Sequence, residues 1–226
     1  MAKKLPATAR KKHLTKAKSE FAQPQRRGAR IRTPRSIQNL KFLPATPDRW
    51  PDVEKLFGER GACGGCWCMT WRIPRPEFNK GKGEANRKSF RAIIRNGEEP
   101  GVIAYSGREP VGWCAVAPRS VYVTLNNSRV LKPIDDKPVW SISCLFVRRD
   151  FRRCGVSSKL ADAAARYAFK HGAKIVEAYP IEPYTDNMPA AFAWTGIPSA
   201  FTSAGFTEVA RRSKSRPILR RAYAKS

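Results

Sequence analysis

A single strand-turn-helix segment constrains the fold of this chain more than any other feature. Residues 139–147 read Val-Trp-Ser-Ile-Ser-Cys-Leu-Phe-Val, with β-branched and aromatic residues on both faces. An Arg-rich turn follows, and residues 157–170 then place Leu160 and Ala164 on one helical face, with Gly172 just past the helix end. Because a strand buried on both faces needs helices on both sides of its sheet, this segment predicts a layered α/β fold.

Strands and helices alternate around this segment from residue 37 onward. Strands are expected at 37–45, 102–105, 111–117, 139–147, 174–179, 206–210 and 217–223, and helices at 46–57, 84–96, 157–170 and 199–204. The order is βααβββαβαββ. It predicts a mixed α+β domain over residues 37–226, with a central mixed sheet of about seven strands flanked by helices.

Residues 1–36 have a different composition. They hold twelve Lys and Arg residues and one acidic residue, Glu20, separated by Pro, Gln, Thr and Ser. This composition predicts a disordered basic arm, which would serve as a tether for nucleic acid or another anionic surface, as a solvated tail, or as a transit peptide. The whole chain has a formal net charge of +26, so the domain itself is also basic and an anionic partner is expected.

Several classes of protein are excluded. The longest uncharged stretch, residues 187–207, contains Pro189, Gly196, Pro198 and Gly205, which do not fit a transmembrane helix. The N-terminus lacks the apolar segment of a secretory signal. A chain with a sizeable core does not need disulfides, so its six cysteines are expected to be thiols. We therefore expect an intracellular, cytoplasmic protein with no membrane span.

The turn before the helix at 157–170 has the features of an anion site. The first amides of a helix have no partner within the helix, and the positive end of its dipole lies there. Gly155 lets a phosphate approach the backbone, and Arg152 and Arg153 add positive charge. Such a turn suits a pyrophosphate, although a basic turn before a helix is also often a solvated loop.

The same segment resembles the acyl-CoA motif of the GNAT superfamily of N-acyltransferases, which reads Arg/Gln-Gly-x-Gly-x-Gly/Ala after a strand ending in Val. The matching residues are Val147, Arg152, Gly155, Val156, Ser157 and Leu160, and the element order over residues 37–223 is also similar to that family. The resemblance implies acetyl-CoA as cosubstrate, no metal, and pairing of pantetheine with main-chain groups of Leu145 and Val147. The implied cofactor residues are Leu145, Phe146, Val147, Arg152, Arg153, Cys154, Gly155, Val156, Ser157 and Ser158.

Three positions depart from the family pattern. Arg153 stands at the first Gly of the motif and Ser157 at its last small residue. In many members a Tyr near the C-terminus protonates the departing CoA thiolate, and here Phe201 occupies that place. The usual general acid is therefore missing.

The resemblance implies direct attack of an amine on the thioester, and the acceptor is a small-molecule amine or a protein amino group. Because only a neutral amine attacks, a base is needed, and Glu177 in the second of two splayed strands is the candidate. An ion pair between Glu177 and a neighbouring Arg is the alternative. Tyr179 and Tyr184 are candidate acids. Cys144 is either an acyl-forming nucleophile or a buried small side chain.

A Cys/Trp cluster at residues 63–72 is the second unusual feature. Cys63 and Cys66 have metal-ligand spacing, but no second Cys or His pair completes a zinc site. In the similar family the corresponding loop walls the acceptor pocket, so Cys66, Trp67 and Trp71 are the predicted pocket residues. A packed apolar plug is the alternative.

Two other functions stay open at this point. One is a nucleic-acid-binding module in which the basic arm acts with a Cys-rich knuckle. The other is a GNAT fold that binds acyl-CoA without turnover, because the usual Tyr is absent. The acidic residues are dispersed, and this does not favour a polycationic acceptor such as an aminoglycoside.

Overall fold

The computed structural model describes residues 39–185 and 188–224, and it contains every strand and helix that the sequence predicts. The strands are β1 (Leu40–Pro44), β2 (Gly101–Ser106), β3 (Glu109–Pro118), β4 (Trp140–Val147), β5 (Ile175–Ala178), β6 (Thr207–Arg211) and β7 (Pro217–Ala222). The helices are α1 (Trp50–Phe57), α2 (Arg75–Lys80), α3 (Glu84–Arg95), α4 (Val123–Asn126), α5 (Val156–Lys170) and α6 (Pro198–Thr202). The short helices α2 and α4 were not predicted. The predicted arm, residues 1–36, lies outside the described residues.

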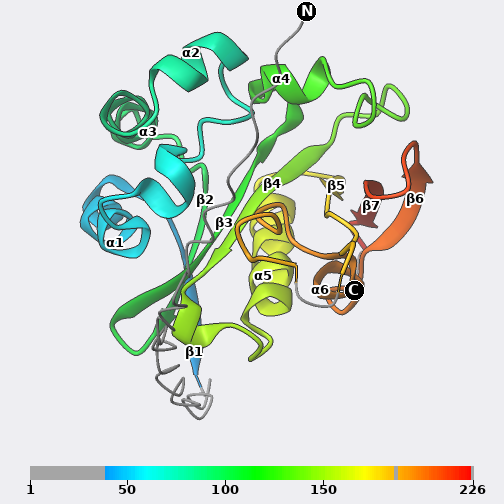
Figure 1. Cartoon of the computed structure of the whole chain (residues 1–226). Coiled ribbons are helices and arrows are strands. Elements are labelled where there is room, and N and C mark those ends of the chain that lie inside the picture. The colour runs from blue at the N-terminus through cyan, green and yellow to red at the C-terminus, as the bar shows by residue number, and fades with distance from the viewer. Residues whose placement is uncertain (1–38, 186–187, 225–226) are drawn as a thin grey trace, which may run out of the picture. The chain divides into compact units, whose positions relative to one another are not determined.

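The seven strands form one mixed sheet in the order β1-β2-β3-β4-β5-β7-β6 (Figure 1). Neighbouring strands are antiparallel except β4 and β5, which are parallel. The parallel pair results from the crossover through α5. This arrangement confirms the predicted mixed α/β fold.

Helices cover both faces of the sheet. The side chains of α1 and α3, among them Trp50 and Phe90, pack with Trp113 of β3 on one face, while α5 and α6 pack on the other (Figure 1). On the α5 side, Leu160 packs so close to Gly112 of β3 that a Cβ at this glycine would lie 2.7 Å from the Leu160 Cδ1. Both faces of β4 are therefore buried, as its sequence predicts.

The parallel strands separate after only three pairs of residues. Pairing runs from Trp140 with Val176 to Ile142 with Ala178, where β5 ends, whereas β4 continues to Val147. The register between β3 and β4 also shifts, and Ser143 has no partner residue on β3. Such a bulge bends a strand and increases its twist. The C-terminal half of β4 is thus free of β5, and this open edge positions the site.

All six cysteines are free thiols, as the sequence predicts. Within residues 39–185 and 188–224, no helix has the length and apolar character needed to cross a membrane.

Candidate active site

Two adjoining cavities lie along the open edge of β4. The first, of about 380 Å³, extends from this edge to the start of α5. The second, of about 500 Å³, extends from the same edge to the Cys/Trp cluster and α2. Both cavities are lined by Ala62, Cys63, Leu145, Phe146, Ala191 and Trp194. These shared residues form a junction through which a ligand in one cavity can meet a ligand in the other.

The first cavity brings together five of the ten predicted cofactor residues, namely Leu145, Phe146, Val147, Arg152 and Ser157. Nε of Arg152 donates a hydrogen bond to the carbonyl of Val147 over 2.8 Å, which fixes the guanidinium at the end of β4. Burial lowers the pKa of Arg152, and the nearby Arg149 lowers it further. Arg149 and Arg152 thus concentrate positive charge at this end of the cavity, and this charge favours binding of an anionic group.

The start of α5 has no side-chain cap. Gly155 precedes the helix in a left-handed conformation with φ of 75°, and no side chain accepts a hydrogen bond from the first amides. The Ser158 hydroxyl instead donates to the carbonyl of Gly155 over 2.9 Å. Because these amides lack partners and lie at the positive end of the helix dipole, they are suited to bind an anion.

The other predicted cofactor residues shape the turn and do not line the cavity. Arg153 has φ of 62°, so it adopts the left-handed backbone expected of the glycine that it replaces. The Cys154 thiol donates to the carbonyl of Arg152 over 3.3 Å, and Val156 is buried in the core below the turn. The turn therefore keeps its glycine-like conformation despite the substituted position.

The edge of β4 is less free than the sequence suggests. The amide of Leu145 donates a hydrogen bond to the carbonyl of Trp194 over 2.7 Å, and the carbonyl of Val147 accepts the bond from Arg152. The main chains of Leu145 and Val147 are expected to pair with pantetheine, and each already uses one group in these hydrogen bonds. A ligand that pairs with Leu145 must therefore displace the carbonyl of Trp194.

Four thiols line the second cavity: Cys63, Cys66, Cys68 and Cys144. Burial raises the pKa of Cys66 to about 11. A hydrogen bond with Cys68, together with burial, raises the pKa of Cys144 well above its usual value. Protonated thiols are poor nucleophiles, which favours the interpretation of Cys144 as a small buried side chain. In the part of the chain that the structure describes, no group of three or more His, Cys, Asp or Glu residues is placed to hold a metal ion.

Of the three predicted pocket residues, Cys66 and Trp71 line the second cavity and Trp67 does not. Its side chain is 3 % exposed and packs against Trp50 and Phe57, with ring centroids 5.9 and 5.5 Å away. Trp67 and Trp71 are four residues apart, a spacing that would place both rings on one face of a regular helix. Trp67 and Cys68 instead have φ of 42° and 54°, and this break in the backbone turns Trp67 into the core.

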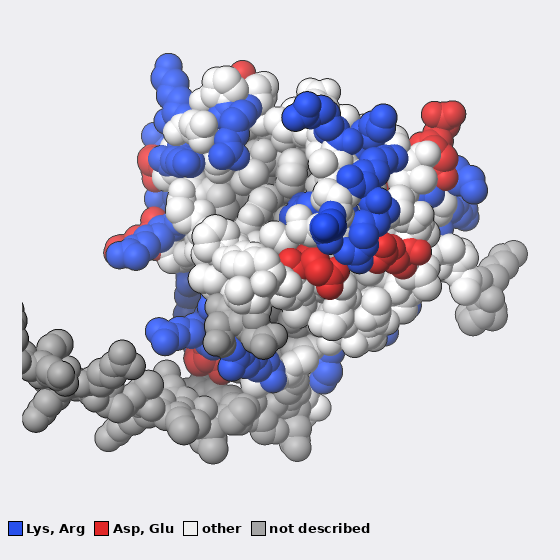
Figure 2. All heavy atoms as spheres, turned by 45° about the vertical axis from the view of Figure 1, so that its right-hand side comes forward, with Lys and Arg blue, Asp and Glu red and all other residues white. Residues whose placement is uncertain are grey.

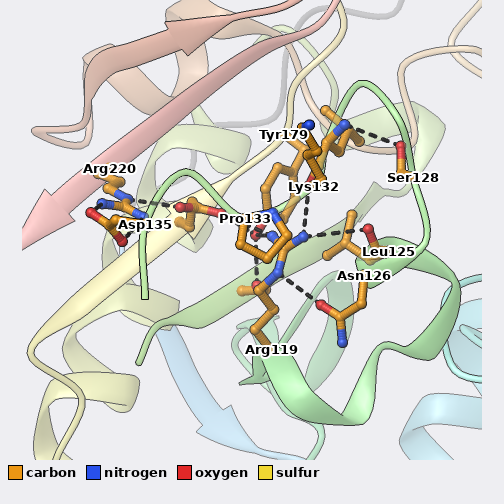
Figure 3. Close-up of polar contacts among 12 residues, drawn as sticks. Arg119, Leu125, Asn126, Ser128, Lys132, Pro133, Asp135, Tyr179 and Arg220 are labelled. Atoms are coloured by element: carbon orange, nitrogen blue, oxygen red, sulfur yellow. Dashed lines mark hydrogen bonds and ion pairs between the residues drawn. The ribbon is translucent and has the colours of Figure 1, made fainter. Parts of the chain in front are cut away.

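Glu177 lines neither cavity. It lies in a buried polar network with Arg119, Tyr179 and Arg220, the three residues of this network that Figure 3 labels. Its Oε1 accepts hydrogen bonds from Arg119 over 3.0 Å and from the Tyr179 hydroxyl over 2.6 Å, and its Oε2 accepts one from Arg220 over 2.7 Å. The side chain is fully buried. A carboxylate held by two guanidinium groups does not fit a general base, so the alternative of an ion pair with Arg describes this residue.

The candidate acids are not at the cavities either. Tyr179 is buried in the same network and also bonds Ser141 over 2.8 Å, and burial raises the pKa of its hydroxyl well above the usual value. Tyr184 is 64 % exposed and lines neither cavity. The two cavities therefore bring together five of the predicted cofactor residues and two of the three predicted pocket residues, but neither the predicted base nor the predicted acids.

Several lining residues were not predicted from the sequence, among them Arg75, Phe78, Lys82 and Trp194. Arg75, Phe78 and Lys82 come from α2 and the turn after it, and Trp194 comes from the uncharged stretch. A six-residue helix gives almost no periodic signal, and the uncharged stretch at 187–207 has no charged side chain that would indicate a site. Among the described residues, no Asp or Glu lines either cavity.

Comparison with known proteins matches residues 67–194 to a family model described as the acetyltransferase (GNAT) family. An acetyltransferase of the GNAT family from Streptococcus agalactiae is 13% identical, with a TM-score of 0.50 over 84% of this chain and 98% of that one. A GNAT acetyltransferase from Listeria monocytogenes is 10% identical, with a TM-score of 0.49 over 81% and 95%. The PaiA N-acetyltransferase from Thermoplasma acidophilum, in complex with coenzyme A, is 12% identical, with a TM-score of 0.46 over 82% and 100%. No curated protein matched the sequence.

Replacement of Glu177 should affect stability and leave the pH dependence of activity unchanged. Glu177→Gln leaves Arg119 and Arg220 without their buried counter-charge, so the free energy of unfolding should fall by roughly 3–5 kcal/mol. Glu182→Gln, at an exposed pair with Arg211, is the control and should change it by less than about 1 kcal/mol. Urea unfolding measures both. A normally stable Glu177→Gln variant with a shifted pH profile of activity would restore Glu177 as the base.

The two tryptophans of the cluster should behave differently. Trp67→Ala removes a buried side chain and should lower the free energy of unfolding by roughly 3–5 kcal/mol. Trp71→Ala, at a partly exposed cavity wall, should lower it by less than about 2 kcal/mol. Thermal and urea unfolding of both variants test this. Equal destabilisation would show that Trp71 is as much a core residue as Trp67.

Proposed function

Because the chain belongs to the GNAT family of acetyltransferases, we propose that it transfers an acetyl group from acetyl-CoA to an amine. The observation that carries this proposal is the pair of cavities that meet at the open edge of β4. One of them extends to the uncapped start of α5, and the other to a pocket of thiols and aromatic rings. A two-substrate transfer requires two sites that meet where the reaction occurs.

The first cavity suits acyl-CoA by its chemistry. The amides at the start of α5, together with Arg152, fit the pyrophosphate, and a helix start in a partly buried geometry contributes about 1–2 kcal/mol to anion binding. Ala190, Ala193 and Ile197 give the cavity an apolar wall that fits the pantetheine chain. The thioester then lies at the junction, beside Leu145 and Phe146.

In the proposed reaction the neutral amine nitrogen attacks the thioester carbonyl carbon. A C–N bond forms, the C–S bond breaks, and CoA leaves as a thiolate that takes up one proton while the nitrogen loses one. The products are an N-acetyl amide and free CoA. Since no carboxylate of the described residues lines either cavity, we assign removal of the ammonium proton to water.

The hypothesis of a nucleic-acid-binding module with a Cys-rich knuckle explains fewer observations than acetyl transfer does. The cysteine thiols face separate partners: Cys63 contacts the carbonyl of Ala191, Cys66 that of Gly61, and Cys68 the indole of Trp113. Together with Cys144 they line a cavity that opens toward the acyl-CoA site. Binding without turnover remains the alternative that an activity assay decides.

Coenzyme A should stabilise the protein. A ligand present at one hundred times its dissociation constant adds about 2.7 kcal/mol to the free energy of unfolding, which differential scanning fluorimetry detects as a higher Tm. Gly155→Glu should abolish the shift because it places a negative side chain beside the anion site. Gly155→Ala carries the same left-handed backbone strain without the charge and should retain most of the shift. Absence of any shift with millimolar CoA or acetyl-CoA would refute the proposed cosubstrate.

The pH dependence of kcat/KM should follow the pKa of the acceptor amine. Without a protein base, log kcat/KM should rise with a slope of one up to the pKa of the acceptor amine, which is about 10.4 for a Lys-like amine. Release of the CoA thiol, measured for two amines of different pKa, tests this. A plateau at one pH, independent of the amine used, would instead indicate a base in the protein.

A further inference from the structure

Arg75 and Lys82 are the only Lys, Arg, Asp or Glu side chains of the described residues that line the second cavity. They flank α2, Arg75 at its first residue and Lys82 two residues past its end. On the face drawn in Figure 2, Lys and Arg side chains stand on both sides of a hollow. The cavity is therefore cationic in its lining, whereas a pocket for a polycationic acceptor would need carboxylates.

Both cations lie over the ring of Phe78. The distance to the ring centroid is 5.5 Å from Cζ of Arg75 and 5.6 Å from Nζ of Lys82. Neither forms an ion pair with a described carboxylate, although Arg87 on the next helix is paired with both Glu54 and Glu84. Two cations held on one buried ring, without a counter-ion, are placed to bind an anionic group.

Aromatic rings also line the second cavity. Trp71 and Trp194 have ring centroids 5.7 Å apart with an interplanar angle of 34°, and Trp194 lines both cavities. Arg75 and Lys82 line only the second cavity, so they are not part of the wall of the acyl-CoA site. The second cavity thus combines two cations, aromatic rings and the residues of the junction.

We propose that the acceptor is a small amine with a carboxylate at the opposite end of an apolar or aromatic body. The carboxylate contacts Arg75 and Lys82, the body packs against Trp71 and Trp194, and the amine reaches the thioester at the junction. This inference rests on the proposed acetyl transfer. It concerns the charge that the acceptor must carry, which family membership does not specify.

Two amines that differ only in this charge test the inference. 4-(Aminomethyl)benzoate and 4-(aminomethyl)benzamide have the same body and amine, but only the first has a carboxylate. With the full chain and acetyl-CoA, release of CoA thiol should give a kcat/KM at least about tenfold higher for the acid, the size of effect expected from charge-assisted contacts. Isothermal titration of each amine into the CoA-saturated protein provides a readout that does not depend on turnover.

Substitutions connect the preference to the two cations. The double variant Arg75→Ala/Lys82→Ala should lose the preference for the acid while keeping the thermal shift with CoA. Lys80→Ala removes an exposed cation of α2 that does not line the cavity, and it should keep the preference. The control separates a specific contact from the general effect of lowering the net charge.

The outcomes distinguish this inference from the proposed function. If CoA binds and amines are acetylated or bound without preference for the acid, the inference is wrong and the acetyltransferase proposal stands. Loss of CoA binding in the double variant would assign the two cations to the cofactor and also overturn the inference. If neither CoA nor acetyl-CoA binds the wild-type protein, the proposed function fails and the inference fails with it.

Discussion

The early end of the parallel pairing between β4 and β5 is the constraint on which the rest of the site depends. Three pairs of residues hold the two strands together, and β4 then continues past the bulge at Ser143 paired with β3 but not with β5. Both cavities use that free half of β4, and α5 starts from the turn that follows it. A fully paired β5 would cover this edge with backbone hydrogen bonds and leave no room for a second molecule.

The point of separation is held by buried charge. Glu177 of β5 binds Arg119 after β3 and Arg220 of β7, and Arg220 also binds Asp135, lowering the pKa of that carboxyl to about 2. Arg119 further donates to the carbonyl of Leu131 over 2.6 Å. The network thus connects β5 and β7 with the long β3–β4 connection. Removal of one charged partner leaves the other charge buried without a counter-charge. The free energy of unfolding therefore falls by more than the net contribution of the ion pair to stability.

The sequence predicted the order of the elements because each long element carries its own signal, such as the two-sided strand at 139–147 and the apolar face of the helix after it. It predicted the helix start after Gly155, with Arg152 beside it, because these residues are adjacent in the chain, and the binding of an anion there stays a prediction. Predictions that depended on contacts between residues distant in sequence were less accurate. Strand periodicity does not show that two arginines distant in sequence surround Glu177, and residue spacing does not show the positive φ that turns Trp67 inward. Arg75 and Lys82 line the same cavity as Trp194 only because the fold brings these distant segments to it.

The hydrogen bond from the Leu145 amide to the carbonyl of Trp194 makes the chain an intramolecular competitor of any ligand that uses the same edge. Such a ligand binds only the fraction of molecules in which that carbonyl has left. Its apparent dissociation constant therefore equals the intrinsic one divided by that fraction. Because Trp194 also lines the second cavity, an acceptor that draws the indole away from this edge would raise the fraction and tighten cofactor binding. By thermodynamic reciprocity, the cofactor would tighten acceptor binding by the same factor.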